Sequence, residues 1–190
     1  MTRFWWVRHG PTKADGLIGW TDVPADLSDT DRVARLAAYL PDAPVISSDL
    51  LRAAATADAI LGDRRRLDHD PDLRELHFGA WEARPFKDLF AEAGEELRLF
   101  YDAPGDTRPP AGESWNDITA RVTVAVDRLL SGHGGTDVIV VAHMGTILTQ
   151  VQRALGLSAH DTLAHRIDNL SVTRIRFDGG WQAEAINHLP

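Results

Sequence analysis

The sequence predicts an α/β fold, a three-layer α/β/α sandwich in which a mostly parallel sheet carries helices on both faces. Residues 137–142, Asp-Val-Ile-Val-Val-Ala, form an unbroken apolar run, which is typical of a central parallel strand covered on both faces. Strand-like and helix-like segments also alternate along most of the chain, as they do in α/β proteins. We expect the 190 residues to form one domain, residues 1–190.

The first third of the chain begins with a strand that stops where Gly10 and Pro11 end regular structure. In chain order the expected elements are a strand at 3–7, a loop at 12–27, a helix at 28–40, a strand at 44–47 and a helix at 48–61. Ser28 and Asp31 have the spacing of a capping box at the first helix, and Ser48 or Asp49 is the expected cap of the second.

Residues 68–112 are the least regular part of the chain and are rich in proline. We expect a small cap-like insertion there, because such insertions often cover a pocket in α/β enzymes; a plain surface excursion is the alternative. The other expected elements are a helix at 86–101 within the insertion, a helix at 115–130 capped by Ser114, a strand at 137–142, a helix at 145–155, and strands at 171–177 and 181–186.

Composition excludes several classes of protein. The net charge of −8 argues against a protein that wraps nucleic acid, and the lack of cysteine excludes disulfides and thiol catalysis. The apolar run at residues 4–7 is too short for a signal peptide or a membrane span, so we expect a cytoplasmic protein without a membrane partner. The eight histidines show no metal-binding spacing, so neither a metal site nor another cofactor is predicted, and nothing indicates an oligomeric state.

Two histidines occupy equivalent places relative to the predicted strands. His9 and His143 each follow a hydrophobic strand directly, and each has a glycine within two residues. In open α/β sheets ligands bind beyond the carboxyl ends of the strands, so the two imidazoles could face one another there. A single histidine at such a position is commonly a strand cap. The pair, with arginines nearby, favours a ligand site.

Three charged residues are candidates for the same ligand site at the carboxyl ends of the strands. Arg8 precedes His9, and Arg52 lies in the first turn of the helix after the second strand. Guanidinium groups grip phosphate in a bidentate way and stay charged. Glu75 lies among apolar and aromatic residues, where a carboxylate loses hydration and suits a general acid. Two alternatives remain open at this point. Arg52 would then be a solvated helix residue, and Glu75 an exposed carboxylate in a loop.

The chain resembles the histidine phosphatase superfamily, which includes cofactor-dependent phosphoglycerate mutases and many small phosphatases. The resemblance rests on five ordered blocks, of which an Arg-His-Gly triplet alone would be weak. The blocks are Arg8-His9-Gly10, residues 48–53 (Ser-Asp-Leu-Leu-Arg-Ala), residues 73–82 (Leu-Arg-Glu-Leu-His-Phe-Gly-Ala-Trp-Glu), Gly112-Glu113-Ser114 and residues 140–143 (Val-Val-Ala-His).

This resemblance implies roles for the five candidates. His9 matches the nucleophile that becomes phosphorylated, Glu75 the proton donor, and Arg8, Arg52 and His143 the charged phosphate pocket. An imidazole attacks phosphorus only when unprotonated, and flanking arginines oppose a positive charge on it. Two guanidiniums and a protonated His143 would then neutralise the phosphoryl group in place of a metal.

Three further residues are candidates for contact with the substrate. Thr12 could help bind phosphate, Met144 could offer its backbone N–H where many relatives have glycine, and Trp20 could line the mouth of the pocket. The loop after the nucleophile departs from the family pattern. Many relatives carry an asparagine six residues after the nucleophile, where this chain has Asp15.

The resemblance implies a metal-independent phosphomonoesterase that takes a small phosphorylated metabolite and releases inorganic phosphate. Phosphoglycerate mutase is the alternative within the family, disfavoured because the chain is short and its insertion is acidic. A weakly active phosphate-binding regulator is a further alternative. The sequence does not distinguish among phosphate esters.

Overall fold

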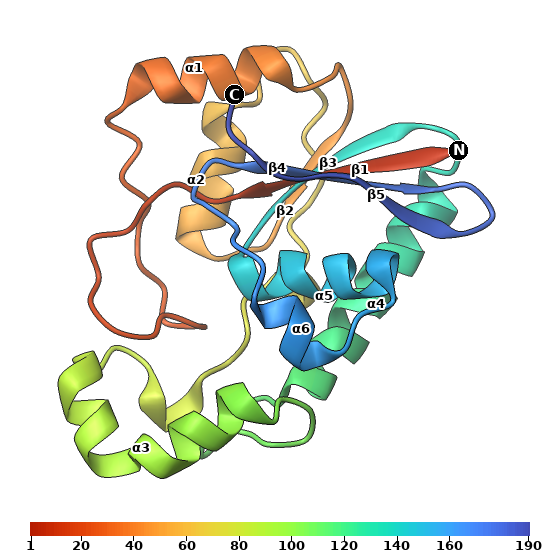
Figure 1. Cartoon of the computed structure of the whole chain (residues 1–190). Coiled ribbons are helices and arrows are strands. Elements are labelled where there is room, and N and C mark those ends of the chain that lie inside the picture. Colours follow the sequence, from red (N-terminus) through yellow and green to blue (C-terminus); the bar gives the residue numbers. More distant parts are fainter.

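The computed structural model describes all 190 residues. Its helices cover both faces of a five-stranded sheet, which confirms the α/β sandwich (Figure 1). None of the helices combines the length and apolar character needed to cross a bilayer. The elements are β1 (Thr2–Arg8), α1 (Thr30–Tyr39), β2 (Val45–Ser47), α2 (Leu51–Ala59), the 3-10 turns η1 (Pro71–Leu73) and η2 (Gly79–Trp81), α3 (Phe86–Asp102), α4 (Trp115–Gly132), β3 (Asp137–Ala142), α5 (Met144–Leu155), α6 (Ala159–Leu163), β4 (Val172–Phe177) and β5 (Trp181–His188).

The sheet has the order β2-β3-β1-β4-β5 and is parallel in its first three strands only. β1 pairs with β3, and β3 with β2, in parallel, whereas β1–β4 and β4–β5 are antiparallel. The last two strands run antiparallel because a tight turn joins them. Gly179 in that turn has φ +74°, a conformation that glycine adopts readily.

Alternate side chains of β1 enter two separate cores, because successive side chains of a strand point to opposite faces. Phe4 and Trp6 pack into the core that α4 and α5 close. Trp5 and Val7 pack into the core that α1 and α2 close. Each side chain of this kind contributes roughly 1.5–3 kcal/mol when it is fully buried, so β1 is anchored from both sides.

The local sequence predicts the N-cap of α4 correctly but not that of α1. At α4 the predicted cap is confirmed, since Ser114 forms a capping box with Asp117. At α1 the expected cap is wrong by one residue. The side chain of Asp29, not Ser28, accepts the N–H of Arg32, at 3.1 Å.

The cap of α2 comes from outside its own segment. Neither Ser48 nor Asp49 caps it, because the helix begins after Leu50, which has no side-chain cap of its own. Instead the N–H of Leu51 donates to Oδ1 of Asp22 at 2.7 Å. The loop after β1 therefore docks on the start of α2.

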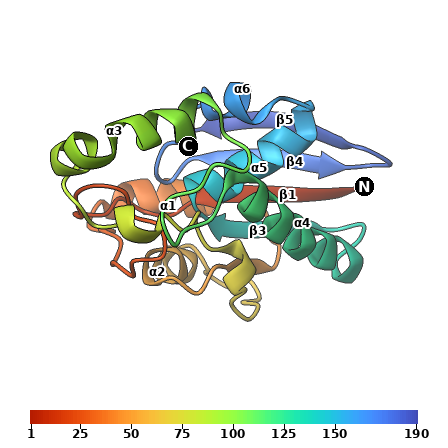
Figure 2. The same ribbon diagram turned by 90° about the horizontal axis from the view of Figure 1, so that it is seen from below.

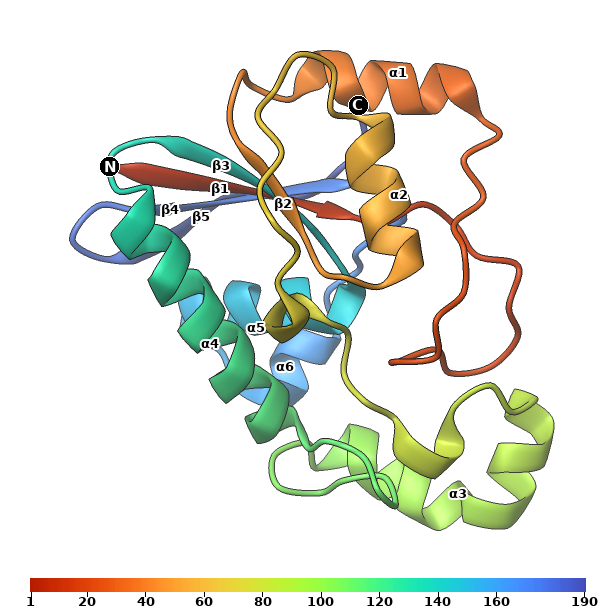
Figure 3. The ribbon, with the colours of Figure 1, turned by 180° about the vertical axis from the view of Figure 1, so that it is seen from behind.

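The insertion at 68–112 places α3 at the end of the sheet where β1 stops. Figures 2 and 3 show α3 apart from the strands, facing the loop that follows β1. Leu89, Leu97 and Phe100 of α3 nevertheless belong to the same apolar cluster as Phe4 and Trp6. The insertion thus covers the carboxyl ends of the parallel strands while sharing the main core.

Candidate active site

The carboxyl ends of β1 and β3 bring two histidines together. The register pairs Arg8 with Ala142, the last residues of these strands. His9 and His143 follow them directly, and their ring centroids lie 5.0 Å apart. The structure therefore joins the two histidines that the sequence places at strand ends.

His9 is a neutral imidazole with its lone pair at Nε2. Nδ1 lies 2.7 Å from the carbonyl oxygen of Gly10, which can only accept, so Nδ1 carries the proton. Nε2 accepts from Nε of Arg52 at 3.3 Å. Burial lowers the pKa of His9 to about 3, helped by the positive charges of Arg52 and Arg8 and opposed by the bond to Gly10. The ring is thus ready for nucleophilic attack near neutral pH.

The two guanidinium groups have no carboxylate partner. Arg52 is 1% exposed, and its Nη1 and Nη2 donate to the carbonyls of Thr21 at 3.1 Å and Gly19 at 2.6 Å. Nη1 of Arg8 donates to the carbonyl of Ile167 at 2.6 Å. Burial lowers the pKa of both side chains, but a guanidinium remains charged in proteins. The site is therefore cationic and suits an anion.

His143 is fully buried beside His9. Its Nε2 lies 2.7 Å from Oγ of Ser48, and its Nδ1 has no hydrogen-bond partner. Burial lowers the pKa of His143 well below its usual value, and His9 and Arg52 add to this effect. The free protein therefore favours a neutral His143, and the protonated His143 expected beside a phosphoryl group stays a prediction. A doubly charged phosphate group beside the ring would act in the opposite direction.

The carboxylate of Glu75 is held by two backbone N–H groups. Oε1 accepts from Leu76 at 2.9 Å, and Oε2 accepts from Gly145, in the first turn of α5, at 3.2 Å. A Cβ atom at residue 145 would lie 2.4 Å from Oε1. The glycine therefore lets the carboxylate approach the helix.

A pocket of about 210 Å³ lies among these groups. It is lined by Arg8, His9, Thr12, Ala14, Gly16, Leu17, Ile18, Arg52, Glu75, Phe78, Tyr101 and Met144. Thr12 and Met144 are thus placed where the sequence expects them, whereas His143 is not among the lining residues. Asp15 is exposed and outside the pocket, so the altered position in this loop does not face the ligand space.

The sequence that forms this site matches a known protein family over nearly the whole chain. Residues 4–188 match the model of the histidine phosphatase superfamily (branch 1). The chain belongs to this superfamily. Among solved structures, Bacillus stearothermophilus YhfR superposes with a TM-score of 0.92 at 26% identity, covering 100% of this chain and 98% of that one.

Two relatives bear the names of different enzymes, a phosphatase and a phosphoglycerate mutase. The adenosylcobalamin/alpha-ribazole phosphatase of Escherichia coli (strain K12) is 30% identical over 192 residues, which cover 97% of this chain and 90% of that protein. The probable phosphoglycerate mutase GpmB of Yersinia pestis (strain Pestoides F) is 30% identical over 199 residues, which cover 97% and 92%. Membership of the family makes this chain an enzyme that acts on phosphate esters.

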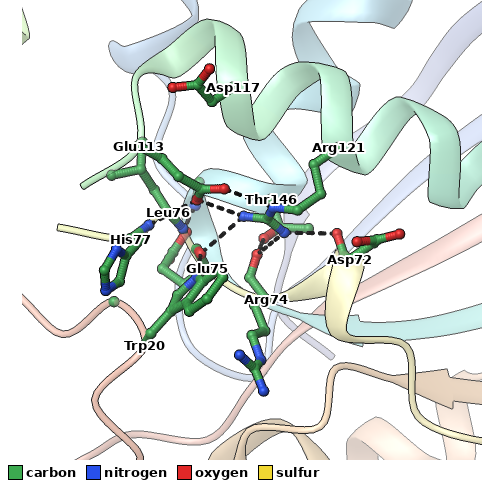
Figure 4. Close-up of polar contacts among 12 residues, drawn as sticks. Trp20, Asp72, Arg74, Glu75, Leu76, His77, Glu113, Asp117, Arg121 and Thr146 are labelled. Carbon is green, nitrogen blue, oxygen red and sulfur yellow. Dashed lines mark hydrogen bonds and ion pairs between the residues drawn. The ribbon is translucent and has the colours of Figure 1, made fainter. Parts of the chain in front are cut away.

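In this histidine phosphatase, Arg121 of α4 fixes the backbone that carries Glu75 (Figure 4). Its Nε and Nη2 donate to the two carboxylate oxygens of Glu113, at 2.9 and 2.8 Å. Its Nη1 also donates to the carbonyl of Arg74 at 3.1 Å, and its Nη2 to that of Glu75 at 3.2 Å. The sequence alone does not indicate a role for Arg121, because an arginine on an amphipathic helix is usually solvated. The Gly-Glu-Ser block around Glu113 was the available signal.

Trp20 supports Glu75 and does not line the pocket. Its Nε1 donates to the carbonyl of Glu75 at 2.8 Å. Its ring centroid lies 4.7 Å from that of His77, and the guanidinium of Arg74 lies over the ring at 4.8 Å. Trp20 is therefore held against Glu75 and His77 (Figure 4) and is not among the residues that line the pocket, contrary to the expectation from the sequence.

Glu82 holds the loop whose carbonyls orient Arg52. Its carboxylate accepts the N–H groups of Trp20 at 2.8 Å, Thr21 at 2.6 Å and Phe78 at 3.0 Å. Burial acts to raise the pKa of Glu82, but these hydrogen bonds and that of the Thr21 hydroxyl outweigh it and lower the pKa. Sequence analysis includes Glu82 in a family block without giving it a role.

Proposed function

We propose that this histidine phosphatase hydrolyses a small phosphomonoester through a phosphohistidine at Nε2 of His9. The strongest support for this mechanism is the protonation state of His9 and its position beside Arg52. Its Nδ1 is bonded to Gly10, and its Nε2 lone pair lies beside the guanidinium of Arg52 in a pocket that Arg8 also lines. A neutral nucleophile among fixed cations is suited to attack on an anionic ester.

In the first half of the reaction, Nε2 of His9 attacks phosphorus and the bond from phosphorus to the alcohol oxygen breaks. Arg8 and Arg52 neutralise charge on the phosphoryl oxygens, and His143 lies beside the nucleophile. Glu75 gives its proton to the departing alcohol oxygen. Thr12 and the backbone N–H of Met144 add donors at the edge of the pocket.

In the second half, water attacks the phosphohistidine in line with the phosphorus–nitrogen bond. Glu75, now a carboxylate, takes the proton from that water. The phosphorus–nitrogen bond breaks, Nε2 regains its lone pair, and inorganic phosphate leaves. One carboxyl group thus serves both steps.

The charge of the pocket favours hydrolysis over mutase activity. A phosphoglycerate mutase must hold a second acidic group while the phosphoryl group returns. The pocket contains no lysine, and its only arginines are Arg8 and Arg52 at His9. Transfer between 2- and 3-phosphoglycerate that depends on 2,3-bisphosphoglycerate would reverse this choice.

We also propose that the protein is cytoplasmic and that its substrate is a small molecule and not a nucleic acid. The net charge of −8 supports the second point, because polyanions are repelled outside the small cationic pocket.

The proposed function is tested by turnover of para-nitrophenyl phosphate together with trapping of the intermediate. We expect steady release of phosphate and a label on the protein that survives base and is lost in acid. His9→Ala should abolish both, whereas His160→Ala, at an exposed histidine outside the pocket, should change neither. Full turnover by His9→Ala contradicts the mechanism, and binding without turnover indicates the regulator.

A further inference from the structure

A second, apolar pocket adjoins the phosphate pocket, and we infer that it is the subsite for the alcohol part of the substrate. The inference rests on the proposed function. The second pocket has a volume of about 50 Å³. Four residues line both pockets, namely Glu75, Phe78, Tyr101 and Met144. The two pockets therefore adjoin at these residues, one of which is the proton donor.

The direction of the reaction leads the alcohol into this second pocket. An attack from Nε2 of His9 expels the oxygen on the opposite side of phosphorus, because attacking and leaving atoms lie in line. Glu75 must reach that oxygen to protonate it. The carbon attached to the oxygen then lies beyond the phosphate group and next to Glu75, where the apolar pocket begins.

Apart from the carboxylate of Glu75 and the hydroxyl of Tyr101, the side chains that line the second pocket are apolar. Beyond the shared residues, its main side chains are Leu76, Phe100, Trp115, Leu148 and Leu163. The indole N–H of Trp115 already donates to Gln152 at 2.7 Å, so it is not free for a ligand. No lysine or arginine lines the pocket. A carboxylate or a second phosphate would lose its hydration there without gaining a partner.

We therefore expect the substrates to be phosphomonoesters of alcohols whose first carbons are apolar, either alkyl or aromatic. The volume of about 50 Å³ holds roughly three or four groups of the size of a methylene. Each buried methylene strengthens binding about fourfold. Phosphoglycerates and sugar phosphates, which carry charge or hydroxyl groups on these carbons, should bind less well.

Equilibrium binding of phosphonates tests the subsite without requiring turnover. The probes are methylphosphonate, butylphosphonate and 2-methoxyethylphosphonate, the last with the length of the butyl compound but with an ether oxygen. We expect butylphosphonate to bind at least about tenfold more tightly than methylphosphonate, and severalfold more tightly than its ether analogue. Equal affinity of the butyl and ether compounds overturns the inference.

A pocket-filling variant localises the effect. Leu163 on α6 is half-buried, so Leu163→Phe should fill the second pocket and remove the preference for butyl- over methylphosphonate. Leu155→Phe, at an exposed leucine of α5 outside both pockets, should keep it. A full preference in Leu163→Phe overturns the assignment of this pocket.

Turnover separates this inference from the proposed function. If the protein prefers butylphosphonate but hydrolyses neither butyl phosphate nor para-nitrophenyl phosphate, the subsite stands and hydrolysis is wrong. If it hydrolyses butyl phosphate and 2-methoxyethyl phosphate with equal kcat/KM and binds their phosphonates equally, hydrolysis stands and the subsite is wrong. Failure of all three phosphonates to bind overturns both.

Discussion

The carboxylate of Glu75 reaches its place because residue 145 has no side chain. Oε2 accepts the N–H of Gly145 at 3.2 Å, and a Cβ atom there would lie 2.4 Å from Oε1. Real Cβ atoms do not approach an oxygen so closely, so an alanine would push the carboxylate away. The proton donor is therefore positioned by the absence of one methyl group.

Gly145→Ala should lower kcat for an alkyl phosphate by roughly 100-fold, because a displacement of about 1 Å at a reacting group costs that much. Residue 145 lies in a regular helical turn, where alanine is favourable, so the fold should persist. Steady-state kinetics and a thermal melt measure the two effects. Gly132→Ala is the matched control, since a Cβ atom there meets nothing within 4 Å. A folded Gly145→Ala protein with unchanged kcat contradicts this account.

Helix α4 offers two arginines that contact the segment leading to Glu75, in different ways. Arg121 is mostly buried and donates to the carbonyls of Arg74 and Glu75. Arg128 is half exposed and donates to the carboxylates of Asp70 and Asp72 at 2.8 Å. The first contact fixes the backbone of the proton donor, whereas the second is a surface ion pair of small energy.

Arg121→Lys should weaken proton donation selectively, because lysine lacks the planar fork that reaches Glu113 and both carbonyls. We expect kcat for butyl phosphate to fall at least about tenfold. The first step with para-nitrophenyl phosphate, measured as the pre-steady-state release of nitrophenolate, should change little, since nitrophenolate leaves without a proton.

Arg128→Lys serves as the control and should change neither substrate. Equal losses in the first step for both substrates in Arg121→Lys would indicate general damage to the fold. That outcome would contradict a positioning role for Arg121.

The elements that the sequence predicts well are those with local causes. The helix cap at Ser114 and the apolar run of β3 depend on neighbouring residues, and both are confirmed. The start of α2 is missed because its cap, Asp22, lies far back along the chain. The short helix α6 at 159–163 has too few residues to show a period.

The same contrast holds within the site. His9 and His143 are identifiable because each directly follows a strand, and strand register then brings them together. The orientation of Trp20 depends on contacts with Arg74 and His77, which belong to another segment. Likewise the protonation of His143 depends on complete burial, which the surrounding fold and not the local sequence decides.

For the molecule as a whole, two buried neutral histidines couple folding to pH. The pKa of His9 is about 3 in the folded protein, below the value of about 6.5 for an unfolded chain. As the pH falls below about 6.5, the unfolded chain takes up a proton that the folded protein does not. The contribution to stability is therefore complete above that pH and is lost as the pH falls toward 3, and the pKa of His143 is shifted in the same direction.

Between pH 7 and pH 5, His9 should remove about 2 kcal/mol from the free energy of unfolding. Urea denaturation at the two pH values measures this loss. In His9→Gln the loss should be smaller by about 2 kcal/mol, because glutamine does not titrate. An identical pH dependence in the variant would show that His9 is not held neutral.

Arg8 and Arg52 donate to backbone carbonyls and to His9, and none of these hydrogen bonds goes to a carboxylate. These two guanidinium groups attract whichever phosphate species is present, and inorganic phosphate keeps the dianionic group that they contact. The alcohol departs first, and the inorganic product then remains beside the two guanidinium groups. We therefore expect competitive inhibition by this product, so that catalysis slows as phosphate accumulates.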